Sequence, residues 1–447
     1  MARRSAASPS TVCPLCAVPL VSERGATPWC ERCAWGIDIY EPSPTANWWQ
    51  RRIGAVAHRF AYRLTIKQFR ELATTHTPFG APTRTGAEQP GGRASVPAVA
   101  RPRRWSRARL AVIGFALFFY AFIAAMALAG AWLVLFRFPN LTLVPGTLLL
   151  LIAAYLVPRL GQVPRHAEVL TREQAPSLYG LIDRMAEAIG APAPSLIVVE
   201  PWFNAQTTVV GLRRRRVLTL GLALWGALSP QQRVAMIGHE LAHFGNGDVR
   251  RGFIVSPAMT TLGRLSELFR VRNLGKTTRR SLVGPIQFMV DGAMRLISAA
   301  LYLAHLGVLI IVLRDGQRAE YLADQRAARL AGSRATVELL NLLLTSADSV
   351  IASRARAKGT QPEWRAAAIE SLTVQAAAMT RLRQLSTRTE VSLWASHPPT
   401  GLRAWLIEGA AWHDPAFVLT EDESERIDAE LSRQYQSARR DLAQSAI

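Results

Sequence analysis

The feature that most restricts the fold is an uninterrupted run of 27 uncharged residues, most of them apolar, from Leu110 to Phe136. A helix needs about 20 apolar residues to cross a bilayer, so this run is long enough to span one with some tilt. A second apolar run of 17 residues, Leu141–Val157, follows after a short break. The two runs together predict a transmembrane hairpin over residues 109–158. Burial in a soluble core is the alternative for either run.

Charge outside these runs indicates the orientation. The chain of 447 residues carries a net charge of +21, and residues 1–109 contain 17 of the basic residues against 6 acidic ones. The segment between the two apolar runs holds only Arg137. Because basic residues are retained on the cytoplasmic side, we expect a multi-pass protein of the cell membrane, in contact with lipid, whose N-terminus and everything after residue 158 face the cytoplasm.

The basic excess is almost entirely arginine, since only Lys67, Lys276 and Lys358 are lysines. A codon bias together with membrane topology explains this excess better than nucleic-acid binding does, so a nucleic-acid partner is not expected. Four cysteines in so long a chain exclude a disulfide-stapled mini-protein, and an apolar fraction of 49% excludes a wholly disordered one.

All four cysteines lie within residues 1–40, in two Cys-x2-Cys pairs: Cys13 with Cys16, and Cys30 with Cys33. Each pair forms a tight turn with two thiolates on one side, and two such turns complete the tetrahedral sulfur site that suits Zn²⁺. The spacing therefore predicts a zinc ribbon with one structural zinc ion. Two disulfides, or redox-active thiols, are the alternatives.

Residues 41–73 are predicted to contain a basic amphipathic helix, because five apolar residues recur there at helical spacing with arginines between them. Such a helix can lie on an anionic membrane surface or pack against the ribbon. Residues 74–108 are rich in Pro, Gly, Thr and Arg without periodicity, which predicts a flexible linker. The apolar residues of the helix are Trp49, Ile53, Val56, Phe60 and Leu64.

The most informative motif is His239-Glu240-Leu241-Ala242-His243. Ser229 is a candidate N-cap for its helix, with Gln232 completing a capping box. On a helix His239 and His243 point the same way, so both imidazoles can bind one metal ion, and Glu240 can reach a metal-bound water and take its proton. The alternative is an ordinary helix with two histidines facing the core or solvent.

A catalytic zinc ion usually takes a third protein ligand. Glu320 is the best candidate, and Asp324, one turn later, can accept a hydrogen bond from a ligating histidine ring. By itself this pair is a weak signal, because such pairs are common on solvated helix faces. Its weight comes from the histidine pair upstream.

Three motifs in order now resemble a known family: His239–His243 followed by Asp248, Glu320 with Asp324, and Ser396-His397-Pro398-Pro399 before Arg403. This set is similar to the membrane zinc metallopeptidases that include the CaaX prenyl endopeptidase and the HtpX-like heat-shock proteases. The resemblance covers about residues 160–410 and the preceding hairpin.

The resemblance implies a gluzincin-like fold, mainly α with a small β-sheet, over residues 159–447. It implies a catalytic zinc ion held by His239, His243 and Glu320, with Glu240 as general base. It also implies that His397 steadies the oxyanion of the tetrahedral intermediate, although His397 can equally be read as a loop residue. Asn204 and Ala205 resemble the family's edge strand, which pairs with an extended substrate; a plain surface strand is the alternative.

The sequence departs from the family pattern in two places. The ribbon and linker are additional, and we expect them to dock a partner protein or a substrate. Between the motifs, Phe253–Gly263 is only 11 residues long, whereas Leu296–Leu313 is an apolar run of 18. Since Glu320 must meet His239 on one side of the membrane, residues 250–318 cross an even number of times or not at all. A helical hairpin packed at the membrane face, with the 18-residue run partly embedded, is favoured over a pair of spans.

These patterns predict a membrane-anchored zinc endopeptidase whose polypeptide substrates are membrane-associated or misfolded; that substrate class comes from the resemblance alone. The alternative is a non-catalytic membrane scaffold whose ribbon recruits a partner. The complete set of three ligands with a general base argues against the scaffold. Short strands are expected at Leu196–Glu200 and Arg216–Leu220, with an exposed one at Phe203–Gly211.

Overall fold

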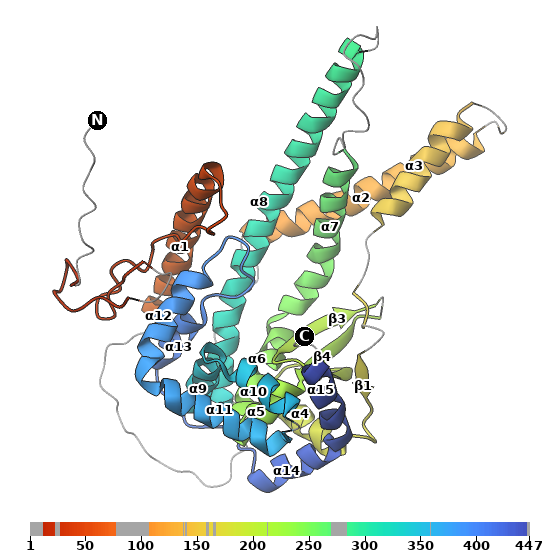
Figure 1. The fold of residues 1–447 in the computed structure, drawn as a ribbon. Coiled ribbons are helices and arrows are strands. Elements are labelled where there is room, and N and C mark those ends of the chain that lie inside the picture. Colours follow the sequence, from red (N-terminus) through yellow and green to blue (C-terminus); the bar gives the residue numbers. More distant parts are fainter. Residues whose placement is uncertain are drawn as a thin grey trace, which may run out of the picture.

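A computed structural model describes most of the chain and shows a mainly helical protein with one small sheet (Figure 1). The sheet and most of the helices lie together, and the long helices extend away from them. The described residues are 12–22, 27–76, 107–136, 138, 141–157, 161–163, 167–211, 213–269, 284–357 and 359–444.

The sheet has four strands in the order β1-β2-β4-β3. β2 and β4 are parallel, whereas β1 and β3 pair antiparallel on the two outer sides. The three strands expected from the sequence are confirmed, while the three-residue β1 was not predicted because it is too short for a pattern. The strands are β1 (Glu168–Leu170), β2 (Leu196–Glu200), β3 (Ala205–Val210) and β4 (Arg215–Gly221).

The main hydrophobic core lies between this sheet and the helices that follow it. Trp225 and Trp364 are almost fully buried there. Arg233 is buried as well, and its guanidinium donates to the carbonyl of Trp225, to Ser424 and to Asp428. The helices that contribute to this core are α4 (Pro176–Ala188), α5 (Leu222–Ala227), α6 (Pro230–Asn246), the C-terminal end of α8 (Gly284–Ala331), α9 (Ser333–Leu344), α10 (Ala347–Arg356), α11 (Gln361–Gln375), α14 (Glu421–Glu430) and α15 (Ser432–Gln444).

The two predicted membrane runs form α2 (Arg107–Leu135) and α3 (Leu143–Leu156), which pack against each other. Their backbones approach closely at two glycines: a Cβ on Gly146 would lie only 2.9 Å from the carbonyl oxygen of Gly130. Leu110–Leu135 is long and apolar enough to cross a membrane. α3 has 14 residues and is about 21 Å long, which is shorter than a hydrocarbon core of about 30 Å.

The segment between the motifs forms α7 (Asp248–Leu268) and the 48-residue α8 (Gly284–Ala331), which pack side by side. α8 also meets the length and composition of a membrane span, and no residue of its most apolar window is fully buried. It continues without a break into the body of the protein (Figure 1). Two described helices can thus cross a membrane by length and composition. The bent pair α9–α10 passes the same test, but it packs in the soluble core.

The amphipathic helix is α1 (Trp48–His76), so it extends three residues beyond its expected end. Its second half is anchored: Tyr62 packs against a ribbon cluster that includes Trp29, and Leu72 packs against Tyr321 of α8. Its first half leaves Ile53 and its apolar neighbours exposed. The contacts therefore favour packing on the ribbon for the second half. Most of the expected linker lies outside the described residues.

Candidate metal centre

Local sequence explains why the helix with the histidine pair begins and ends where it does. α6 starts with a capping box, in which Ser229 accepts from the backbone of Gln232 and the Gln232 side chain accepts from the backbone of Ser229. It ends at Gly247, whose φ of 71° lies in the left-handed region that favours glycine. Within this helix, His239 and His243 are one turn apart.

The two histidines and Glu320 of α8 converge. Nε2 of His239 lies 3.3 Å from Nε2 of His243, and each of these atoms lies 3.4 Å from an oxygen of Glu320. For ligands about 2.0–2.1 Å from a tetrahedral zinc ion, geometry requires separations of about 3.3–3.4 Å. The observed distances fit this requirement. Among the described residues the three side chains form one of two groups that could hold a metal ion.

Asp324 orients the first histidine. One of its oxygens lies 2.9 Å from Nδ1 of His239. This contact assigns the Nδ1 proton to the shared hydrogen bond and leaves the Nε2 lone pair facing Glu320 and His243. Asp324 is in turn held by Arg403, which donates from Nε and Nη2 at 2.7 Å each. Arg403 lies on α13 (Thr400–Glu408).

The electrostatics of the group favour a bound cation. Burial raises the pKa of Glu320, but contacts with His239 and His397 and the charge of Arg403 outweigh it and keep the pKa well below its usual value. Burial likewise raises the pKa of Asp324, and Arg403 more than reverses that effect. Burial lowers the pKa of His239, yet the two carboxylates raise it to about 10. Two ionised carboxylates thus share a buried site that attracts positive charge.

The group opens into a cleft of about 460 Å³. Glu240 faces this cleft beside the histidines, and His397 lines it from the loop before α13. Nδ1 of His397 lies 2.9 Å from Oε2 of Glu320, which accepts no hydrogen bond of good geometry within the described part of the chain. A buried carboxylate oxygen without a donor is the kind of atom that a metal ion would satisfy.

The edge strand borders the same cleft. β3 pairs only with β4, so its outer edge is free of strand partners within the described sheet. Asn204 and Ala205, at the start of that edge, line the cleft. The carbonyl of Asn204 accepts from Gly221, where a Cβ would lie 2.4 Å from that oxygen. Glycine at position 221 therefore allows Asn204, the residue before β3, to lie close to the end of β4.

Several residues of the site carried no sequence signal for their roles. Arg403 was noted only as a motif position, although it secures Asp324. Glu390 lines the cleft and was not noted at all. The apolar cleft wall, with Leu339, Leu340 and Leu343 of α9, was also missed, because a buried leucine and a cleft leucine look alike in sequence. The side chain of Asp248 lies outside the described residues.

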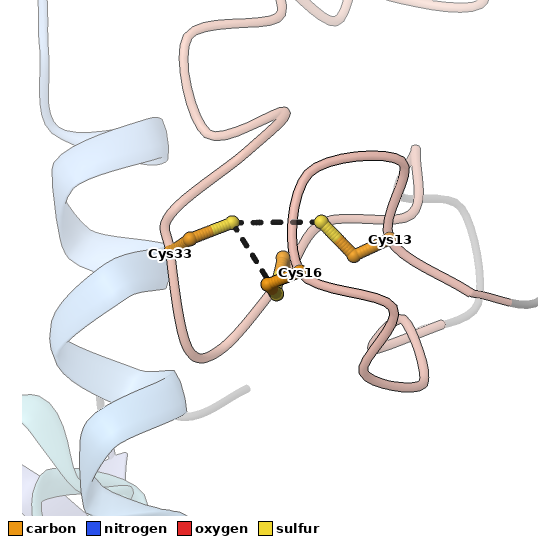
Figure 2. A group of neighbouring side chains, drawn as sticks. Cys13, Cys16 and Cys33 are labelled. Atoms are coloured by element: carbon orange, nitrogen blue, oxygen red, sulfur yellow. Dashed lines mark hydrogen bonds between the residues drawn. The ribbon is translucent and has the colours of Figure 1, made fainter.

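The second group that could hold a metal consists of the four cysteines, of which Figure 2 shows Cys13, Cys16 and Cys33. Sγ of Cys13 lies 3.5 Å from Sγ of Cys33, Cys16 lies 3.4 Å from Cys30, and Cys16 lies 3.7 Å from Cys33. All four are free thiols. A tetrahedral zinc ion with bonds of about 2.3 Å would hold sulfurs about 3.8 Å apart. The arrangement is close to this spacing and far from that of bonded sulfurs.

The part of the chain that holds this site is similar in sequence to known proteins. The model of peptidase family M48 matches residues 172–411, more than half of the chain. The chain is 23% identical over 198 residues to a protease HtpX homolog of Methanocaldococcus jannaschii, covering 42% of this chain and 64% of the relative. It is 26% identical over 249 residues to one of Gemmatimonas aurantiaca, covering 55% and 79%. A homolog of Listeria innocua is 33% identical over 103 residues, covering 23% and 33%.

Two of these three matches cover less than two thirds of the relative's length. No solved structure matches the chain.

Proposed function

The chain belongs to peptidase family M48, and from that premise we propose that it is a membrane-anchored zinc endopeptidase whose reaction centre is the His239–His243–Glu320 group. The observation that carries the proposal is the convergence of these three side chains at 3.3–3.4 Å in a cleft that also holds Glu240. A scaffold would need neither the cleft nor the general base.

A zinc ion bound there would polarise a peptide carbonyl and lower the pKa of a water molecule. The residues of the chain carry the remaining steps. The carboxylate of Glu240 accepts the proton of the attacking water and passes it to the leaving amine. His397, which lines the cleft beside Glu320, donates to the oxygen that becomes negative in the tetrahedral intermediate. Asp324 and Arg403 hold His239 in the tautomer that leaves Nε2 free.

Substrate binding follows from the edge strand and the cleft wall. An extended polypeptide adds to the free edge of β3, and main-chain hydrogen bonds at Asn204 and Ala205 align its scissile bond with the centre. Such recognition reads backbone and requires an unfolded segment. The substrates we propose are therefore membrane-associated or misfolded polypeptides, a class that also fits the relatives named as HtpX proteases.

Location and the second metal complete the proposal. The hairpin of α2 and α3 anchors the protein in the cell membrane, and because the ribbon before it contacts α12 after it, both lie on the same side of the membrane. The basic residues of the N-terminal segment favour the cytoplasmic side for the catalytic domain. The four thiols of the ribbon hold a structural zinc ion, whose coordination supplies folding free energy to a segment with a small core. The protein would then carry two zinc ions per chain.

Replacing Glu240 with Gln tests the proposal. Glu240→Gln keeps the shape of the side chain but cannot accept the proton, so we expect hydrolysis of an unfolded protein such as casein to fall at least about a hundredfold. Zinc content should be unchanged. Glu338→Gln, at an exposed ion pair with Arg334, is the matched control and should cleave as the wild type does.

Two results would contradict this assignment. Full activity of Glu240→Gln would remove that side chain from the mechanism. If the zinc-loaded wild-type protein cleaves no polypeptide, the result would favour the scaffold. Proteins that co-purify with Glu240→Gln but not with the wild type would identify the natural substrates.

A further inference from the structure

The helix before the His397 loop has an unusual environment. α12 (Met379–Thr389) has the mostly polar sequence MTRLRQLSTRT. Even so, its second half is buried: Gln384 is 4% exposed, Ser386 3% and Arg388 6%. A polar helix of this length is not stable alone in water, so its order depends on the elements that cover it. Two different elements do so, one on each side.

The ribbon covers one side through hydrogen bonds and ion pairs. The indole Nε1 of Trp29 donates to the side-chain oxygen of Gln384 at 2.9 Å, and Nε2 of Gln384 donates to the carbonyl of Glu31 at 2.7 Å. Arg388 donates to the carbonyl of Thr27 at 2.6 Å and pairs with Glu41. These groups recognise the folded shape of the ribbon, since three of the four partners are main-chain carbonyls or a buried indole.

Apolar contact strengthens this junction. Trp29 is 1% exposed. It forms a cluster with Val21 and Ile37 of the ribbon, against which Leu385 of α12 and Tyr62 of α1 pack. The ribbon is therefore joined to the peptidase domain by a small shared core. A module that only recruits partners would have no need for this core.

On its other side α12 contacts α13. Oγ of Ser386 accepts from the backbone of Gly401 at 2.8 Å, and a Cβ on Gly401 would lie 2.2 Å from the carbonyl oxygen of Arg383. Arg383 also holds Glu408 through two hydrogen bonds of 2.6 and 2.8 Å. These contacts join α12 to α13, and α13 carries the Arg403 that secures Asp324.

The loop between these helices is closed over the cleft. Its first residue, Glu390, accepts from the backbone and hydroxyl of Thr400 at 2.7 and 3.1 Å, which ties the two loop ends together. Gln317 of α8 donates to the carbonyl of Ala395 at 2.8 Å. His397 then lies beside Glu320. The position of His397 therefore depends on how α12 is held.

From this continuous path we propose that the four-cysteine ribbon is an internal brace, which positions the Glu390–His397 loop over the reaction centre through α12. Gln384 and Arg388 are the positioning residues; neither lines the cleft. The expected effect of the brace on cleavage rests on the proposed function. The expected ordering of the loop by the ribbon does not. It also assigns the ribbon a role that needs no partner protein.

The test removes the junction while leaving both metal groups intact. The variants are Gln384→Ala with Arg388→Ala on α12, and Trp29→Phe on the ribbon, which keeps an aromatic ring but removes the indole donor and part of the buried ring system. Arg365→Ala, which breaks an Arg–Glu pair of α11 with Glu421 far from the ribbon, is the control. The readouts on the full chain are amide hydrogen exchange, zinc content, and kcat and KM on an unfolded substrate.

We expect exchange in residues 379–399 to become about tenfold faster in the double variant, and by a smaller factor in Trp29→Phe. Zinc content should stay at the wild-type value. kcat should fall more than KM rises, because a displaced His397 weakens stabilisation of the transition state. The control should match the wild type in all three readouts.

Unchanged exchange in residues 379–399 in both variants would overturn the brace. So would faster exchange accompanied by unchanged kcat, since α12 would then not position His397. Exchange does not require turnover, so a wild type that cleaves nothing would refute the proposed function, and the exchange data would still decide whether the ribbon orders this loop. Cys33→Ser, which weakens the ribbon from within, should reproduce the exchange pattern of the double variant.

Discussion

Removal of the Asp324 carboxylate should weaken zinc binding without touching a ligand. Asp324 is 2% exposed, lies 2.9 Å from Nδ1 of His239 and accepts two hydrogen bonds of 2.7 Å from Arg403. Asp324→Ala leaves the buried guanidinium without its partner, which costs about 3–5 kcal/mol of folding stability. It also frees the His239 ring to rotate and to change tautomer, which typically lowers zinc affinity about 10–100-fold.

Asp324→Asn separates the two effects. The amide oxygen can still accept from His239, so zinc affinity should fall less than in Asp324→Ala. The negative charge facing Arg403 is lost in both variants, so both should lose thermal stability. Asp183→Asn, at an exposed pair with Arg172, serves as the control and should change neither property.

The assay is a competition titration, in which the apparent zinc affinity is measured against a chelator of known strength, together with thermal unfolding of the same preparations. Asp324→Ala should lose zinc at a chelator concentration that leaves the wild type and Asp183→Asn loaded. Wild-type affinity in Asp324→Ala would refute the argument that Asp324 holds His239 in its ligating tautomer.

Two further perturbations test the same site and its support. In chelator-treated protein the pKa of His239 is raised from 6.5 to about 10, so protonation of this ring stabilises the fold fully below about pH 6.5, and that stabilisation is lost as the pH rises toward 10. The unfolding temperature should therefore fall between these two pH values. An unfolding temperature that does not change with pH would show that His239 is not protonated in the folded protein. Gly401→Ala would place a Cβ 2.2 Å from the carbonyl oxygen of Arg383, so we expect a loss of about 1–3 kcal/mol in the free energy of unfolding, measured by denaturant titration beside Gly307→Ala, whose Cβ would meet nothing within 4 Å.

Sequence patterns were sufficient to predict those elements whose stabilising interactions join residues close together in the chain. The α6 helix was predicted with its capping box, because Ser229 and Gln232 are three residues apart and act on the same turn. The pairing of His239 with His243 follows from helical periodicity alone. Three of the four sheet strands and the run that became α2 were likewise predicted, since alternation, length and lack of charge are properties of a short window. The two cysteines of each Cys-x2-Cys pair face the same way because only two residues lie between them.

The tertiary structure decided everything that joins distant segments. Asp324 reaches His239 across 85 residues, and Trp29 reaches Gln384 across 355. No window of sequence contains such a pair, so Arg403 appeared only as a motif position, and the residues that form α12 were given no role. The amphipathic helix shows the same limit: its periodic stripe was recognised, yet only packing shows that Tyr62 faces the ribbon while Ile53 stays exposed.

The sequence by itself therefore determined which side chains are able to bind a metal ion, move a proton or enter a membrane, because these capacities belong to residue type and short spacing. The tertiary structure decided which of them meet. The charge and hydrogen bonds of Arg403 keep the pKa of Asp324 low despite its burial, and contact with the ribbon is what buries the polar face of α12. Both effects depend on the low polarity and close packing created when separate segments come together, and neither exists along the extended chain.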